Sequence, residues 1–391
     1  MAKTVVGLEI TEESVRAVEV TAGDRPVLVA SGEIALPWGA ARDSEVLDQD
    51  AVALALRQLW SRGGLHSRRV VLGIGSRRVL VREFATQTIR PDLLAHSLPA
   101  EVQHLLPVPA SQAVLDFLPI AEADGKTSGL LVAAVSQTVS TLLATLRKAR
   151  LRADAVDFAP FGLARAAGTL AHHGETLAMV HVGDHTSYVV VVRDGVPLFV
   201  RILPIDIPTA ASIARVGSRP VAEDHADTVA EDHADVGSLH DSSAHADSDA
   251  DPAFSDIDAT VVDVYSALAA RVGADVPLGR VRLGAGAEGP GSPIAAPVPV
   301  AAADLASRVR STFAFHEGRS DDASSIDRVL LSGAGAASPG VFEAIDDAVD
   351  MEVVLVEAGD LVPVGTSVVP GGDVARDLVS TIGLVLSQEA A

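Results

Sequence analysis

The sequence contains no cysteine among its 391 residues. This absence excludes a disulfide framework, a thiol nucleophile and a thiolate metal site. Also missing is any apolar run near the roughly 18–20 residues that a membrane-spanning helix needs. The first residues, Met1 to Thr4, lack the basic and then apolar pattern of a signal peptide and lead into a predicted strand. We therefore expect a cytoplasmic protein that reaches a membrane only through a partner, without inserting into it.

A basic surplus is missing as well. The chain has 30 Lys and Arg residues against 52 Asp and Glu residues, a net charge of −22. Residues 1–219 hold 22 of each kind, so the acidic excess lies in residues 220–391. This distribution argues against nucleic-acid binding, which needs a basic face, and against direct docking on an anionic membrane. Hydrophobic residues make up 48% of the chain, which indicates globular domains with sizeable cores.

A pattern of three short strands occurs twice along the chain. Its first copy comprises residues 5–10, 15–20 and 27–29, and its second comprises residues 179–183, 187–192 and 198–200. In each copy a short polar turn joins the first two apolar runs, and a Gly/Pro turn precedes the third. The repeated meander predicts two related lobes that face a cleft. The residues in the two first turns then decide what that cleft does.

Hydrophobic periodicity places the other elements. Predicted helices span about residues 50–61, 92–105, 137–149, 303–315 and 374–386, and predicted strands span residues 70–74, 79–81, 114–118, 130–135, 328–332 and 353–356. In this scheme residues 85–156 form a small separate unit.

An acidic segment interrupts the second half. Residues 220–270 contain no Lys or Arg and 13 acidic residues, and the octamer 221–228 is repeated almost unchanged at 229–236. Such aromatic-poor sequence buries too little apolar surface to order itself, so we expect a disordered insertion over about 208–255. Its four histidines leave open a metal-responsive role beside that of a soluble linker.

Five segments together carry a family resemblance. They are residues 6–10 with 14–19; 101–109 with 114–117; 156–165; 183 with 186–187 and 195–199; and 330–335. In this order they resemble the PilM family, actin-like proteins of type IV pilus assembly that are related to the division protein FtsA. The second segment is the most specific, because it joins a helix ending in Pro-Val-Pro to a strand containing Leu-Asp-Phe. The resemblance covers roughly residues 4–205 and 303–387.

The resemblance implies an α/β, two-lobed actin-like fold, which is a duplicated ribonuclease H-like fold. The lobe 1 core would comprise residues 1–84 and 157–177, with 85–156 as an inserted subdomain associated with peptide binding. The lobe 2 core would comprise residues 178–207 and 325–391, and its subdomain 208–324 would contain the acidic insertion.

In this family ATP and Mg²⁺ lie between the lobes, and a groove on the first lobe holds the cytoplasmic N-terminal tail of PilN, a single-span membrane protein. The resemblance therefore implies a PilN-like partner, bound as an extended peptide in a preformed groove. It also implies contact with other pilus assembly proteins.

The resemblance places the first phosphate turn at Thr11, Glu12 and Ser14, with Glu9 as the candidate Mg²⁺ ligand. Where the family typically has glycine and small residues, this chain has Thr11 and Glu12. Like unit charges about 5 Å apart repel by about 3 kcal/mol at an effective dielectric constant near 20, so the two carboxylates of Glu12 and Glu13 disfavour polyphosphate. Without glycine, the turn also blocks close approach of the backbone.

The second phosphate turn would comprise Gly183, Thr186 and Ser187. His181 stands where the family has an aspartate, and Asp184 and His185 follow Gly183. The adenosine-side turn would be Gly333, Ala334 and Gly335, in which one of the family's consecutive glycines is replaced. Both phosphate turns also fit ordinary surface β-turns. His181 as a general base remains an alternative, although no nucleophile or metal set surrounds it.

Two functions of different classes follow from these residues. The first is a scaffold of type IV pilus or related secretion assembly, with no catalytic residue and a degenerate nucleotide site. The alternative is a nucleotide-dependent actin-like protein whose ATP state regulates pilus assembly.

Overall fold

The computed structural model describes residues 3–23, 25–88, 90–217, 298–318, 325–365 and 373–386. Most of the predicted disordered insertion, 208–255, lies outside these residues. At its start the prediction is wrong, because Ala210–Gly217 forms helix α5. The Thr209 hydroxyl accepts the Ser212 N–H at 3.1 Å and so caps this helix.

The first sheet contains the first copy of the meander. Its strands are β1 (Thr4–Ile10), β2 (Ser14–Thr21), β3 (Leu28–Ala35), β6 (Arg69–Ile74) and β10 (Arg152–Phe158), in the order β10-β6-β1-β2-β3. The meander is antiparallel, whereas β6 and β10 continue the sheet in parallel with β1. Helix α1 (Gln49–Arg62) contacts β2 and β3, and Asp48 caps its first turn.

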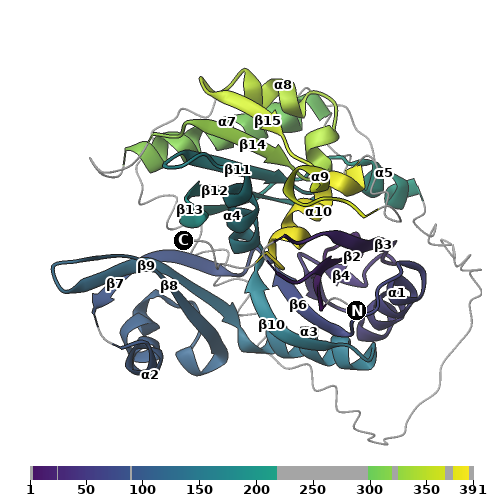
Figure 1. Cartoon of the computed structure of the whole chain (residues 1–391), viewed down its shortest axis with the longest axis horizontal. Helices are drawn as coiled ribbons and strands as arrows, with labels where there is room; N and C mark the ends of the chain where they lie inside the picture. The colour runs from purple at the N-terminus through teal and green to yellow at the C-terminus, as the bar shows by residue number, and fades with distance from the viewer. Residues whose placement is uncertain are drawn as a thin grey trace, which may run out of the picture. The chain divides into compact units, whose positions relative to one another are not determined.

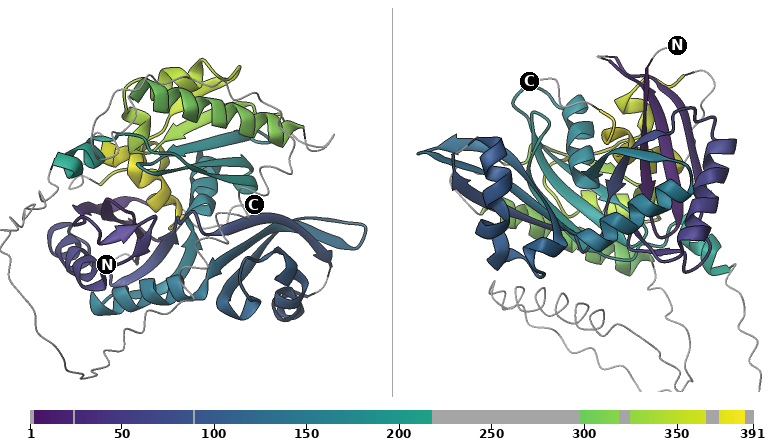
Figure 2. Two further views of the ribbon diagram at one scale, coloured as in Figure 1. Left: turned by 180° about the vertical axis from the view of Figure 1, so that it is seen from behind. Right: turned by 90° about the horizontal axis from the view of Figure 1, so that it is seen from below.

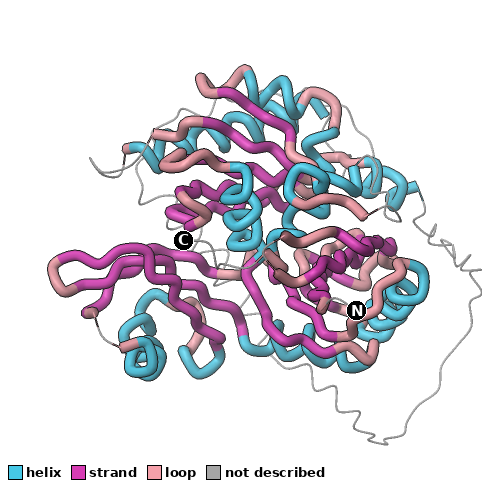
Figure 3. Tube along the Cα trace, viewed as in Figure 1, coloured by secondary structure: helices cyan, strands magenta, loops and turns pink. Residues whose placement is uncertain are grey.

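The second sheet repeats this plan. Its strands are β11 (Thr176–Val182), β12 (Thr186–Arg193), β13 (Val196–Pro204), β14 (Arg328–Ser332) and β15 (Glu352–Leu355), in the order β13-β12-β11-β14-β15. Strand directions match those of the first sheet one for one. The duplicated meander of the sequence is therefore confirmed as two sheets of one topology (Figures 1 and 3).

Two helices pack between the sheets. Helix α4 (Ala159–Leu170) contacts β11, β12 and β13 on one side, and α10 (Asp373–Gly383) contacts β1 and β2 on the other. The helices touch where Gly162 faces Gly383, since a Cβ on Gly383 would lie 2.0 Å from the Gly162 carbonyl oxygen. This contact joins two segments from distant parts of the sequence (Figure 2).

A third, antiparallel sheet has its own small core. It comprises β7 (Leu80–Gln87), β9 (Lys126–Val135) and β8 (Ala113–Ala123), and it lies beside helix α2 (Pro91–Val102) and the short helices η1 (Gln103–Leu105) and η2 (Ala110–Gln112). Leu98, Val102 and Leu131 are its buried residues, and the rings of Phe84 and Phe117 meet edge to face at 6.0 Å. A separate core is the property expected of an inserted unit.

The predicted inserted unit, 85–156, is wider than this sheet. Helix α3 (Ser136–Lys148) contacts α1, and β10 pairs with β6, so both pack on the first sheet. Strand β7 begins earlier, at Leu80. The division of the chain into four domain parts stays a prediction.

The remaining elements complete the two lobes. They are β4 (Ala41–Arg42), β5 (Glu45–Val46), α7 (Val298–Glu317), η3 (Ala334–Ala337), α8 (Val341–Asp346) and α9 (Ala358–Leu361). Helix α7 buries Leu305, Val309 and Phe313 in the core of the second sheet. Of the helices that the structure describes, none combines the length and apolar character needed to cross a membrane.

Candidate functional site

The two first turns of the meanders line one cavity. Five residues predicted for the nucleotide site lie around it, namely Glu9, Thr11, Glu12, Gly183 and Thr186. Its volume is about 50 Å³, whereas pockets for small molecules usually measure about 300–1,000 Å³. The predicted residues are therefore brought together, but the space among them holds little more than a water molecule.

The β1–β2 turn satisfies its own polar groups. Thr11 N–H donates to the Ser14 carbonyl oxygen at 2.9 Å, and Ser14 N–H donates to the Thr11 hydroxyl at 3.0 Å. The Ser14 hydroxyl donates to Glu33. Thr11 and Ser14 thus hydrogen-bond to each other through polar groups that the resemblance assigned to phosphate binding.

Glu9 is held by hydrogen bonds from α10. Its Oε2 accepts the hydroxyl of Ser380 at 2.6 Å and that of Thr381, and Glu9 itself is buried. The Arg16 guanidinium lies 3.8 Å from the same oxygen. The candidate Mg²⁺ ligand therefore already has three polar neighbours from its own chain.

Arg16 is the buried cation of this cluster. It pairs with Glu9 across the β1–β2 register and binds Asp377 of α10 at 2.6 Å. Burial opposes its charge, but Asp377 and Glu9 together raise the pKa of Arg16 above its usual value. Burial also raises the pKa of Asp377 to about 6, because the attraction of Arg16 offsets only part of that effect.

His181 and Tyr188 occupy the matching register position in the second sheet. Their rings stack at 6.3 Å, and His181 Nδ1 lies 2.9 Å from the Ser332 hydroxyl. Burial, with the positive charge of Arg16, lowers the pKa of His181 to about 3, so its imidazole is neutral at pH 7. Tyr188 donates its hydroxyl to the Gly75 carbonyl oxygen, which joins the second sheet to the end of β6. These contacts give His181 a structural role instead of that of a base.

His185 connects the two first turns. Its Nε2 lies 2.8 Å from Glu13 Oε1 and 4.0 Å from Glu12 Oε1, and its Nδ1 lies 2.7 Å from Asp206 Oδ1. The hydrogen bond with Glu13, together with that of Asp206, raises the pKa of His185 to about 9 against the opposing effect of burial. Side chains thus span the place where the resemblance puts phosphates.

The other predicted site residues do not line this cavity. Ser187 is buried within β12. In the turn after β14, Gly333 has a φ of +92°, and a Cβ there would lie 2.2 Å from the Val182 carbonyl oxygen. Ala334 N–H donates to Asp377 Oδ1 at 2.7 Å. A Cβ on Gly335 would lie 2.5 Å from the Val182 side chain, so packing alone requires this small residue.

Mg²⁺ and ATP do not fit this arrangement as it stands. Mg²⁺ takes oxygen ligands in near-octahedral geometry at about 2.0–2.1 Å, but Glu9 is engaged by two hydroxyls and by Arg16. The contact between Glu13 and His185 closes the gap between the two turns. A nucleotide would have to displace these side chains.

Sequence reasoning missed three residues that close the cleft, namely Arg16, Asp206 and Asp377. Arg16 carried a signal, because it is a basic residue directly between the apolar Val15 and Ala17 of a predicted strand. Asp377 gave none, since its partner comes from the other end of the chain.

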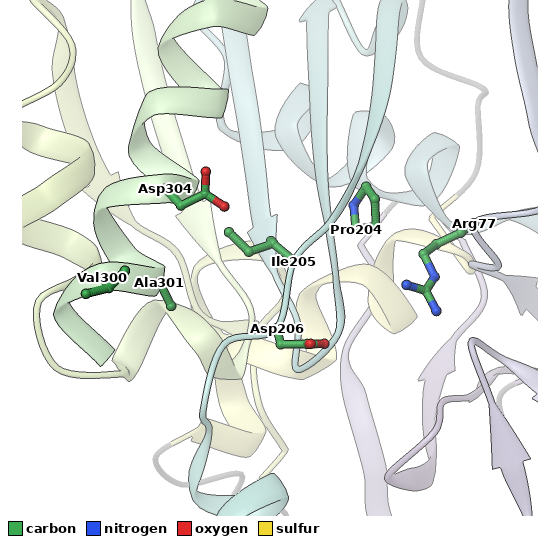
Figure 4. Close-up of a pocket in the computed structure, with 7 residues that line it drawn as sticks. All are labelled: Arg77, Pro204, Ile205, Asp206, Val300, Ala301 and Asp304. Atoms are coloured by element: carbon green, nitrogen blue, oxygen red, sulfur yellow. The ribbon is translucent and has the colours of Figure 1, made fainter. Parts of the chain in front are cut away.

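A larger cavity lies beside Asp206. It has a volume of about 390 Å³ and is lined by Arg77, Pro204, Ile205, Asp206, Val300, Ala301 and Asp304 (Figure 4). Because Asp206 also binds His185, it links this cavity to the turns. The seven lining residues are those found within the part of the chain that the structure describes.

Two sheets of one topology, with helices packed between them and strand turns facing a shared cavity, define an actin-like protein. The chain belongs to the family of the type IV pilus assembly protein PilM, which matches residues 7–203. A search of curated proteins found no match to the sequence.

A solved structure with a TM-score above 0.5 shows the same fold. A PilM–PilN type IV pilus biogenesis complex has a chain that is similar with a TM-score of 0.66 and 18% identity, over 97% of each chain. The ethanolamine utilization protein EutJ from Carboxydothermus hydrogenoformans has a TM-score of 0.47 and 13% identity, over 99% of this chain and 90% of EutJ. The activator of the 2-hydroxyisocaproyl-CoA dehydratase from Clostridium difficile, with bound ADPNP, has a TM-score of 0.39 and 12% identity, over 98% of this chain and 93% of the activator.

Proposed function

We propose that this protein is a cytoplasmic scaffold of type IV pilus assembly with a degenerate nucleotide site. Its partner is the N-terminal cytoplasmic tail of a bitopic inner-membrane protein of the PilN kind, which brings it to the membrane surface. Membership of the PilM family and the similarity to a chain of a PilM–PilN complex support this partner. Contacts with other pilus assembly proteins belong to the same role.

The observation that carries the proposal is the ion pair of Arg16 with Asp377, beside Glu9. A guanidinium stands next to the carboxylate that a Mg²⁺ ion would need. Removing one partner of such a buried pair leaves a costly unpaired charge, so Arg16 is not easily displaced. The cleft is thus held together by side chains of the chain itself. The segments of the first lobe that carry the family resemblance are present in the sequence.

Two strand edges of the first lobe offer places for an extended tail. Among the described residues, β8 pairs only with β9, and β10 pairs only with β6. Helix α3 contacts both edge strands. Val114 on β8 and Val156 on β10 are exposed, and both belong to segments of the family resemblance. An extended peptide binds such an edge through main-chain hydrogen bonds and alternate side chains.

Binding of a labelled tail peptide tests the proposal. The probe is the N-terminal segment of the PilN-like protein from the same genome, and fluorescence anisotropy gives its dissociation constant. We expect Val156→Glu to weaken binding at least tenfold, whereas Val196→Glu serves as the matched control. Val196 is exposed to 36% on β13 of the second sheet, against 37% for Val156.

No binding of the tail to the unaltered chain would contradict the scaffold role. Equal weakening by both variants, or unchanged binding by Val156→Glu, would contradict binding of the tail at the β10 edge.

The alternative is that ATP and Mg²⁺ bind and regulate assembly. Gly183 and Thr186 at the cavity favour it, because both fit a turn that presents N–H groups to phosphate. Calorimetric titration of the full chain with Mg²⁺-ATP separates the two functions. The scaffold proposal predicts no heat of binding at micromolar nucleotide, and a micromolar dissociation constant would favour the alternative.

A further inference from the structure

Three metal-binding side chains converge where the two first turns meet. Glu12, Glu13 and His185 each offer a ligand atom, and these atoms lie within 4.8 Å of one another. Glu12 and Glu13 come from the β1–β2 turn, and His185 comes from the β11–β12 turn. This group is distinct from Glu9, the residue that the family resemblance assigned to Mg²⁺.

The spacing of the donor atoms suits one ion. His185 Nε2 lies 2.8 Å from Glu13 Oε1 and 4.0 Å from Glu12 Oε1. Two ligands at about 2.0–2.2 Å from a tetrahedral Zn²⁺ are separated by roughly 3.4 Å, a value between the two observed distances. Small rotations of the glutamate side chains would bring both oxygens to that separation.

Supporting partners hold two of the three ligands. His185 Nδ1 is hydrogen-bonded to Asp206 Oδ1 at 2.7 Å, which leaves Nε2 directed at the glutamates. Glu12 Oε2 accepts the Asp43 N–H at 3.2 Å, which orients its other oxygen toward His185. A histidine that binds a metal usually donates its other ring N–H to a carboxylate or a carbonyl group, and ligating carboxylates are themselves hydrogen-bonded.

We propose that Glu12, Glu13 and His185 form a site for a divalent transition-metal ion of the Zn²⁺ class, with Asp206 as the positioning residue of His185. An imidazole with two carboxylates and an open fourth position suits Zn²⁺, whereas Mg²⁺ and Ca²⁺ prefer oxygen ligands alone. The carboxylates of Glu12, Glu13 and Asp206 lie next to one imidazole, and their negative charge favours a divalent cation at this place.

The ion would join the two lobes. Its ligands come from turns on different sheets. A bound metal ion, in place of a nucleotide, therefore stabilises the closed cleft. The side chains of His185 and Glu12 are 31% and 24% exposed, which leaves the site open to ions from solution.

Calorimetric titration of the full chain with ZnCl₂ tests the site. We expect one binding event that His185→Gln removes and that Asp206→Asn weakens by about 10–100-fold, the usual cost of losing such a partner. His172→Gln is the matched control, because the ring of the exposed His172 meets, among the described residues, the single carboxylate of Glu175, at 3.1 Å. His225, His233, His240 and His245 are present in all variants, so any Zn²⁺ that they bind cancels in the comparison.

Cobalt substitution supplies a second readout, because the visible absorption of Co²⁺ reports its ligand geometry. We expect a tetrahedral spectrum with the unaltered chain that Glu12→Gln alters, and Mg²⁺ should not compete with Co²⁺. Identical Zn²⁺ isotherms for the unaltered chain and His185→Gln would overturn the site. Should His185→Gln fail to fold, unchanged Zn²⁺ affinity in both Glu12→Gln and Asp206→Asn would overturn it equally.

Discussion

At the scale of single residues, Arg16 is the centre of the cleft. Its guanidinium binds Asp377 and lies beside Glu9, and all three side chains are buried. A fixed cation of the chain therefore lies beside Glu9, the carboxylate that the family resemblance assigns to Mg²⁺. This single residue links the closed cleft to the stability of the fold.

Replacing Arg16 should destabilise the protein strongly. Arg16→Met leaves Glu9 and Asp377 without their cation, and breaking a buried pair in this way costs about 3–5 kcal/mol. Urea unfolding measures this loss. The control is Arg69→Met, because the Arg69–Asp154 pair, at 2.6 Å, is 71% exposed at the arginine, and solvent-exposed pairs contribute little to stability. Equal losses in the two variants would refute the central role of Arg16.

His181 should make the fold sensitive to acid. Its pKa is lowered from 6.5 to about 3 by burial, so the folded state takes up its proton later than the unfolded state does. Its contribution to stability is complete above pH 6.5 and is lost between about pH 6.5 and 3, by up to about 1.4 kcal/mol per pH unit. In His181→Gln the free energy of unfolding should fall less steeply between pH 6.5 and 4.5. The same slope in both proteins would contradict this account.

At the scale of elements, the crossing of α4 and α10 determines how the two sheets approach each other. Glycines meet there because backbone atoms fill the space that a Cβ would occupy. The two glycines belong to segments that the sequence pattern had marked separately, 156–165 and 374–386. Their contact explains why both need a small residue.

Gly383→Ala should therefore destabilise the fold. The new Cβ would lie 2.0 Å from the Gly162 carbonyl oxygen, and overpacking of this kind typically costs about 1–3 kcal/mol. Gly359→Ala in α9 is the control, since a Cβ there comes within 4 Å of a single described residue, Val364, at 3.9 Å. Thermal unfolding of both variants gives the comparison. An unchanged melting temperature in Gly383→Ala would show that the helices can separate without loss of stability.

The elements also show how far the sequence alone could lead. The strands of both meanders and helices such as α1 and α3 follow from apolar periodicity, because each buries one face or both faces of a regular element. Helix α5 was missed, since the acidic composition that follows it dominated the local helical pattern. The predicted turn residues converge because two copies of one topology bring the same edge of each sheet to one cavity.

The partners of those turn residues could not be predicted in the same way. Arg16 meets Asp377, and Glu13 meets His185, through packing of elements far apart in the sequence. Hydrophobic periodicity indicates which face of an element is buried. It does not indicate which side chain of another element that face contacts. The closure of the cleft therefore appears only in the folded chain.

At the scale of the whole molecule, the chain keeps the actin-like fold but joins its two lobes with its own side chains. Tyr188 with Gly75, and His185 with Glu13, connect the two lobes directly. A protein held closed in this way should present its first lobe to a partner in one conformation. Its role in pilus assembly would then depend on binding and not on a nucleotide cycle.

The most direct test is the affinity of the full chain for the labelled PilN-like tail, measured with and without millimolar Mg²⁺-ATP. The closed cleft predicts the same dissociation constant in both conditions, within about twofold, or about 0.4 kcal/mol. A change of tenfold or more, about 1.4 kcal/mol, would mean that nucleotide reaches the cleft and controls the partner site. That result would contradict the scaffold account.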